Sequence, residues 1–282
     1  MRIDTEGTDL KQRVITAVIA IALFVVLLFF LPTWVLTIAW GALCAVGVWE
    51  LLYATHSVPK HLFLYLSCAA GFCIPLTVAR PNTDLFLFLL AAGIYMVAAF
   101  ACAVFDHKTI TYDMVGKGFL AAVILPMMFS AVLRIRSGEN GALLVLMPWI
   151  TVWVCDSAAM FVGKALGKHK LAPYVSPKKT VEGSLGGLIF AMLACVLYVL
   201  VMRKSFGLEM AYLPAVIFGA VGSSLGQLGD LSLSVIKRGA GIKDYGNVFP
   251  GHGGVWDRFD SILFAAPLFE LVYQHILPRL MG

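Results

Sequence analysis

The sequence predicts an all-α, polytopic membrane protein of about nine transmembrane helices, with its polar site at the cytoplasmic face. Of its 282 residues, 60% are hydrophobic and only 13% are charged, whereas soluble domains carry about 25% charged residues. The charges are also unevenly spread, since residues 14–53 contain only Glu50. Several of the uncharged runs reach the roughly 20 residues that cross a hydrocarbon core. Because lipid offers no hydrogen-bond partners, these runs are expected to form helices.

The order of the apolar runs predicts the helices one by one. The first run follows Lys11 and Arg13, is longer than a typical signal-peptide core and leads through Pro32 into the next run, so we expect a retained helix. Very short breaks at Pro32 and near Pro81 predict antiparallel helical hairpins. The helices are expected near 14–31, 34–54, 61–79, 84–105, 115–135, 140–163, 183–202, 211–229 and 258–278.

The distribution of lysine and arginine predicts the orientation. With nine helices, most of the 21 basic residues fall on the side of the N-terminus, and basic loops stay in the cytoplasm. Both long polar loops, 163–183 and 229–258, are then cytoplasmic. We expect a plasma or inner membrane protein with N-terminal helices in 1–135 and a catalytic region in 136–282. The six cysteines lie in apolar runs without a C-x-x-C pair, which argues against disulfide and zinc sites.

The first polar loop is rich in lysine. Asp156 ends an uncharged run, where a carboxylate is costly and usually functional. Hydroxyls, amides and lysines before the next helix suit a phosphate group. The alternative is ordinary flanking charge, or attraction to anionic lipid headgroups. The candidate binding residues of this loop are Asp156, Lys168, Ser176, Lys178, Lys179 and Thr180.

The second loop combines glycines with acidic and basic residues. Six glycines between positions 239 and 254 would let backbone amides approach a phosphate, although the Walker A spacing is absent. Asp257 and Asp260, three apart at the start of the last helix, are expected to share a face opposite Asp230. Such carboxylates suit a divalent cation that holds a polyphosphate. The alternatives are helix capping for the aspartates and interfacial anchoring for the basic residues.

The second loop contains a continuous motif, which reads Ser234-x-x-Lys237-Arg238-x4-Lys243-Asp244-x-Gly246-x2-Phe249-Pro250-x-His252-Gly253-Gly254-Val255-x-Asp257-Arg258-Phe259-Asp260. This motif resembles the signature of the phosphatidate cytidylyltransferases, also called CDP-diacylglycerol synthases. The segments around Asp156 and over 176–183 are also similar to that family, whereas the first 130 residues match only as apolar helices. Leu233 departs from the pattern, which has an acidic residue there in many members.

The resemblance implies that CTP and phosphatidate react to give CDP-diacylglycerol and pyrophosphate. It implies Mg²⁺ as the cofactor, with a monovalent cation such as K⁺ as a further candidate. It implies a metal site at Asp230, Asp257 and Asp260, with Lys237 and Arg258 as further catalytic residues. Membrane lipids are expected partners and nucleic acid is not, and a family-like homodimer is an expectation that no motif demonstrates. Substrate-binding roles in the second loop are expected for Ser234, Arg238, Lys243, His252, Gly253 and Gly254.

Two other functions remain to be weighed. CDP-alcohol phosphotransferases and intramembrane prenyltransferases carry repeated acidic motifs, and this chain has a single D-x-x-D. A transporter or channel would suit helices broken by glycine and proline. However, the middles of the predicted helices are almost free of ionisable residues and no inverted repeat is evident, so an enzyme at the membrane boundary is favoured.

The predicted metal role of Asp257 can be tested directly. Asp257→Asn keeps the size of the side chain and removes its charge, so it should abolish Mg²⁺-dependent CDP-lipid formation by purified, folded protein. Full activity of this variant in a CTP:phosphatidate assay would remove Asp257 from the site.

Overall fold

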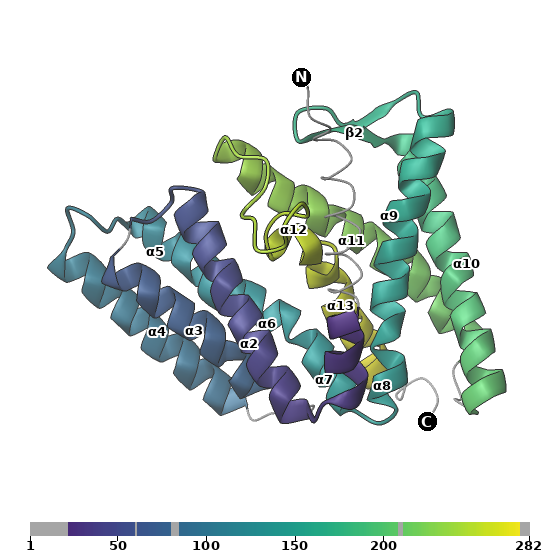
Figure 1. Cartoon of the computed structure of the whole chain (residues 1–282), viewed down its shortest axis with the longest axis horizontal. Helices are drawn as coiled ribbons and strands as arrows, with labels where there is room; N and C mark the ends of the chain where they lie inside the picture. Colours follow the sequence, from purple (N-terminus) through teal and green to yellow (C-terminus); the bar gives the residue numbers. More distant parts are fainter. Residues whose placement is uncertain (1–21, 60, 80–84, 208–210, 277–282) are drawn as a thin grey trace, which may run out of the picture. The chain divides into compact units, whose positions relative to one another are not determined.

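The computed structural model describes residues 22–59, 61–79, 85–207 and 211–276 (Figure 1). This part of the chain is almost entirely helical, which confirms the all-α membrane class. Within it, six helical segments are long and apolar enough to cross a membrane, fewer than the nine expected. They are Thr33–Ala54, Leu85–Phe105, Tyr112–Ser137, Gly141–Leu166, Val181–Phe206 and Tyr212–Gly239. The helix expected at 14–31 lies partly outside the described residues, and its end contains η1 (Val26–Phe30).

Two predicted spans are shorter than expected. The helix predicted at 61–79 is α3 (Leu62–Val78), which has 17 residues and contains Pro75. The helix predicted at 258–278 is interrupted, because Asp260 Oδ1 accepts a hydrogen bond from the Ser261 backbone N–H at 2.8 Å, a local bond that competes with helical pairing. Its pieces are α12 (Trp256–Phe259), α13 (Ile262–Glu270) and η4 (Leu271–Ile276), so Asp257 and Asp260 do not share one helix.

The chain forms two compact units, which are described separately. The first unit runs to Ser137 and also includes Gly239–Phe259, and the second comprises Gly138–Arg238 and the residues from Asp260 onward. The Gly-rich segment, Gly239–Phe259, therefore lies in the same compact unit as the N-terminal helices. The predicted catalytic region over 136–282 stays a prediction.

The first unit contains three neighbouring helices and an aromatic contact between α2 and α6. α2, α3 and α4 lie side by side (Figure 1). Trp40 stacks on Phe129 with ring centroids 4.4 Å apart, and its Nε1 donates to the Phe129 carbonyl at 3.1 Å. The described helices of this unit besides α3 and α12 are α2 (Thr33–Trp49), η2 (Glu50–Ala54), α4 (Leu85–Phe105), α5 (Tyr112–Phe119), η3 (Leu120–Ile124), α6 (Leu125–Phe129) and α7 (Ala131–Ser137).

The second unit depends on close helix packing at small residues. A Cβ atom at Gly187 would lie 2.7 Å from the Cys155 carbonyl oxygen, so α10 approaches the α9 backbone closely there, as small residues permit in membranes. α10 begins at Thr180, whose Oγ1 accepts from the Gly183 N–H at 3.1 Å. The elements besides α13 and η4 are α8 (Gly141–Leu144), α9 (Leu146–Leu166), β1 (Lys170–Ala172), β2 (Ser176–Thr180), α10 (Val181–Phe206) and α11 (Tyr212–Gly239).

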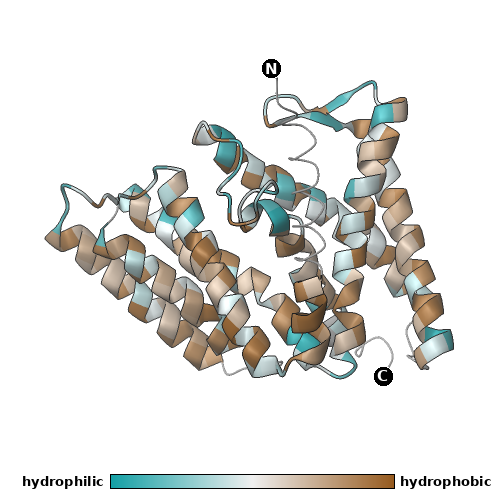
Figure 2. Ribbon diagram, in the orientation of Figure 1, coloured by the Kyte–Doolittle hydropathy of each residue, from teal (hydrophilic) through white to brown (hydrophobic). Residues whose placement is uncertain are grey.

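Both predicted polar loops contain regular structure. Within 163–183, β1 and β2 form an antiparallel hairpin with Lys170 opposite Thr180, a small sheet that the all-α prediction omitted. The loop predicted at 229–258 starts later, because α11 continues to Gly239. A helix can carry charged residues once it leaves the hydrocarbon. Figure 2 shows hydrophilic residues at the hairpin and at the C-terminal end of α11, and mostly hydrophobic ones along α10.

Gly219 provides a test of the helix packing in the second unit. Its Cβ would lie 2.6 Å from the Met192 Cα of α10, so Gly219→Ala must push two backbones apart and should cost roughly 1–3 kcal/mol. Gly93→Ala is the matched control, because nothing lies within 4 Å of a Cβ there. Thermal unfolding in detergent should show a lower midpoint for Gly219→Ala alone, and equal midpoints for both variants would contradict the packing.

Candidate functional site

The central contact of the second unit is an ion pair between β2 and α11. Lys179 Nζ pairs with Asp230 Oδ2, and both side chains are about one quarter exposed. Ser234, one helical turn after Asp230, donates from Oγ to Asp230 Oδ1 at 3.3 Å. Asp230 and Ser234 lie on α11 and not in the predicted loop, and the helix places them on one face.

Two further carboxylates lie close to this ion pair. Asp156 Oδ2 accepts from Ser261 Oγ at 3.4 Å, which connects α9 to the turn before α13. Burial and the neighbouring Asp230 carboxylate raise the pKa of Asp260 above its ordinary range, while Lys237 opposes that shift. Lys237 is buried near the end of α11. Together Asp156, Lys179, Asp230, Lys237 and Asp260 form what we call the charged cluster.

The lysine-rich hairpin is fixed at both ends. Glu182 accepts the backbone N–H groups of Lys168 and His169 at 3.1 and 3.2 Å, and its Oε1 lies 2.6 Å from His169 Nδ1. Arg238 Nε donates to the Val175 carbonyl at 3.2 Å, which ties the end of α11 to the hairpin. Glu182 is not among the site residues predicted from the sequence. Its position just inside a helix start, after a run of lysines, is the signal that could have found it.

In the first unit, the Gly-rich segment folds around Asp257. The buried Asp257 carboxylate accepts from the Tyr245 N–H at 2.7 Å and the Gly254 N–H at 2.9 Å through the same oxygen, Oδ2. Gly253 has a φ of 92°, a conformation that favours glycine. Asp257 therefore organises the backbone of its own segment.

A second carboxylate of the first unit, Glu50, reaches the same segment. Its Oε2 accepts from the Val255 N–H at 2.6 Å, and the side chain is buried. Glu50 is the single charged residue of 14–53 and is not among the predicted site residues. A lone carboxylate in an apolar run is the same signal that singled out Asp156.

The remaining predicted binding residues divide between the two units. Thr180 acts as the N-cap of α10, and His252 Nδ1 lies 3.4 Å from the Pro250 carbonyl. The substrate-binding roles of all these residues stay predictions. Lys168, Ser176, Lys178 and Thr180 lie on or beside the hairpin of the second unit, and Lys243, His252, Gly253, Gly254 and Arg258 lie in the first unit.

The carboxylates of the second unit offer the oxygen atoms that hard metal ions use as ligands. Among the described residues, no three His, Cys, Asp or Glu side chains form a metal-binding group. Burial first, and then the neighbouring Asp230 carboxylate, raises the pKa of Asp260, and these two residues are the ones that would hold a divalent cation. Mg²⁺ commonly takes one or two protein carboxylates and completes its shell with water and substrate phosphates. The chemistry of this pair therefore fits Mg²⁺.

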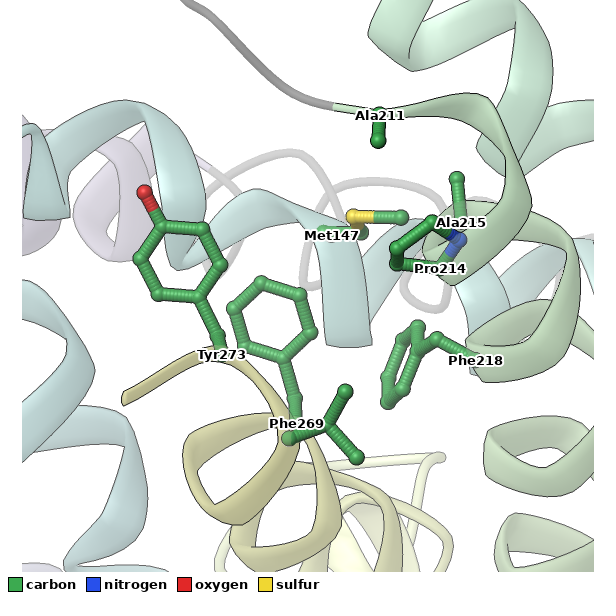
Figure 3. Close-up of a pocket in the computed structure, with 8 residues that line it drawn as sticks. Met147, Ala211, Pro214, Ala215, Phe218, Phe269 and Tyr273 are labelled. Carbon is green, nitrogen blue, oxygen red and sulfur yellow. The ribbon is translucent and has the colours of Figure 1, made fainter. Parts of the chain in front are cut away.

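A small apolar pocket of the second unit lies away from this chemistry. It has a volume of about 20 Å³ and is lined by residues that include Met147, Pro214, Phe218 and Phe269 (Figure 3). Phe218 precedes Asp230 by twelve residues on α11, which is about 18 Å of helix. The pocket is too small and too apolar for charged substrates.

Comparison with known proteins gives a consistent result. Residues 11–276 match the cytidylyltransferase family. A phosphatidate cytidylyltransferase of Bacillus subtilis is 37% identical over 270 residues, covering 92% of this chain and 96% of that protein. One of Haemophilus influenzae is 30% identical over 295 residues, covering 95% and 100%. One of Staphylococcus epidermidis is 42% identical over 134 residues, covering 48% and 50%.

The family match extends over both units, including the N-terminal helices for which the motifs gave no specific evidence. The resemblance inferred from the motif around residues 234–260 is thereby confirmed. This chain belongs to the cytidylyltransferase family.

Proposed function

We propose that this protein is a phosphatidate cytidylyltransferase, which converts CTP and phosphatidate to CDP-diacylglycerol and pyrophosphate. The two relatives that align over nearly their whole length carry that name. The structural observation that carries the proposal is the Lys179–Asp230 ion pair within the charged cluster. It gathers acidic and basic groups from α9, β2, α11 and the turn before α13, as two polyanionic substrates require.

The reaction needs charge neutralisation more than it needs a base. A phosphatidate oxygen attacks the α-phosphorus of CTP, and the bond to the bridging oxygen of the β-phosphate breaks, releasing pyrophosphate. The nucleophile is already ionised, so no covalent enzyme intermediate is required, and positioning and electrostatics dominate. Lys179 and Lys237 are the cations of the cluster that would offset the phosphate charge.

Asp230 and Asp260 would hold Mg²⁺ in this proposal. A bound Mg²⁺ supplies positive charge to the phosphate oxygens that attack and leave. In the absence of Mg²⁺, Lys179 forms an ion pair with Asp230, and the positive charge of Lys237 partly offsets the rise in the pKa of Asp260. Asp257 as a third ligand, and K⁺ as a second cation, stay predictions.

The apolar helices fit a multi-pass membrane protein. We further propose that the charged cluster faces the cytoplasm from the plasma or inner membrane, as the basic loops predict. Phosphatidate would then enter sideways, with its acyl chains remaining in hydrocarbon. The homodimer expected from the resemblance stays a prediction.

The activity and its metal dependence can be tested together. Purified protein, labelled CTP and phosphatidate vesicles should give labelled lipid and an equal amount of pyrophosphate, with no product once Mg²⁺ is chelated and recovery when it is added back. Asp230→Asn should lower the rate roughly 100-fold, because it weakens electrostatic stabilisation. Absence of CDP-lipid with wild-type protein contradicts the function, and undiminished turnover without divalent cations contradicts the metal role.

Lys179 should contribute mainly to substrate binding. Lys179→Ala removes a charge-assisted contact of about 1.5–3 kcal/mol, which corresponds to a KM for CTP or phosphatidate raised roughly 10- to 100-fold. Lys204→Ala, an exposed lysine at the other end of α10, is the control for lost charge. Steady-state kinetics with each substrate varied separately would measure both, and unchanged KM values for Lys179→Ala would exclude this role.

A further inference from the structure

Glu50 is a buried carboxylate in an apolar helical segment. It follows directly after α2, within the candidate membrane span Thr33–Ala54, and only 4% of its surface is exposed. A charge in such a place is costly, and it is usually retained for a specific contact. The structure shows which contact this is, since Glu50 Oε2 accepts from the Val255 N–H at 2.6 Å.

Two glycines of the Gly-rich segment leave room for this carboxylate. A Cβ at Gly246 would lie 2.0 Å from Glu50 Oε1, and a Cβ at Gly254 would lie 2.5 Å from Oε2. Neither glycine has a positive φ. At both positions, the missing side chain is explained by the closeness of Glu50 rather than by backbone conformation.

The preceding turn of α2 also contacts this segment, through Gly47 and Trp256. A Cβ at Gly47 would lie 2.6 Å from the Trp256 ring, and the Trp256 side chain is fully buried. Gly47 and Glu50 are three residues apart, so both lie on one face of the helix. This face of the helix therefore contacts the Trp256 indole at Gly47 and the Val255 backbone N–H at Glu50, one turn later.

The segment held in this way carries Asp257. Val255, whose N–H binds Glu50, follows Gly254, whose N–H binds Asp257 at 2.9 Å. Adjacent amides thus point to two different carboxylates, one from the N-terminal helices and one from the motif. A shift of the backbone away from Glu50 would move the amide that orients Asp257.

We propose that Glu50 is a positioning residue for the reaction, because its carboxylate fixes the backbone of the Gly-rich segment and thereby the place of Asp257. This inference rests on the proposed function, since the formation of CDP-lipid is its readout. It assigns a role to the N-terminal helices, which the motifs do not cover.

The first test compares two substitutions at the same position. Glu50→Ala removes the acceptor and should lower the rate roughly 100-fold, the cost of a misplacement of about 1 Å at a reacting site. Glu50→Gln keeps a carbonyl oxygen for the Val255 N–H and should stay within about 3-fold of wild type, since a neutral hydrogen bond is about 1 kcal/mol. Ser67→Ala is the control, because it removes another buried hydrogen-bonding group of the first unit, the hydroxyl bonded to Phe63 and Tyr95, and should leave the rate unchanged.

The second test uses the contact with Gly246. Gly246→Ala as a single substitution should lower the rate of CDP-lipid formation, because its methyl group collides with the Glu50 carboxylate. Combining it with Glu50→Ala removes the collision, so the double variant should be no slower than Glu50→Ala alone. If Glu50→Ala does not give folded protein, Glu50→Asp, which is shorter by one methylene, takes its place in both tests.

The outcomes separate this inference from the proposed function. Failure of wild-type protein to form CDP-lipid contradicts the function itself. If wild type is active, three results overturn the role of Glu50 alone. The first is a fully active Glu50→Ala variant, and the second is an equal loss of rate in Glu50→Gln and Glu50→Ala. The third is a double variant whose loss of rate is the product of the losses in Gly246→Ala and Glu50→Ala. Thermal unfolding of each variant in detergent confirms that rates are compared between folded proteins.

Discussion

The ion pair between Lys179 and Asp230 is the contact on which the second unit's polar end depends. The Asp230 side chain is only about one quarter exposed, and a carboxylate with so little contact with water is stabilised by an opposite charge. The partner comes from β2, so the hairpin has to be held in place. Glu182 holds it at its base and Arg238 at its turn. The extension of α11 beyond the expected boundary and the presence of the hairpin are thus two parts of one arrangement.

The first unit uses carboxylates for a different purpose. A segment rich in glycine has many backbone amides and few side chains to satisfy them, and buried amides need acceptors. Glu50 and Asp257 supply acceptors to three of these amides, at Val255, Tyr245 and Gly254. The glycines that suggested a phosphate cradle in the sequence therefore also serve, at two positions, to admit a carboxylate of the protein itself.

These two arrangements suit chemistry between anions. Two phosphate-bearing substrates repel each other, and catalysis requires positive charge and fixed dipoles where they meet. The charged cluster combines two lysines with three carboxylates, and the Lys179–Asp230 ion pair joins the two kinds of charge. In the proposed function, these groups would hold a divalent cation and the substrate phosphates. Burial is the main cause of the raised pKa of Asp260, and the neighbouring Asp230 carboxylate adds to the rise.

The sequence by itself determined the membrane class, the polar stretches and, through the motif at 234–260, the family. These properties follow from composition and local spacing, which need no knowledge of distant contacts. The tertiary structure decided how many runs are long enough to span, that Asp230 and Ser234 lie on a helix, that Asp257 and Asp260 are separated by a turn, and that Glu50 contacts Val255. Hydropathy could not supply these results, since a charged helix end resembles a loop in composition and a hydrogen bond between residues 205 positions apart leaves no local pattern.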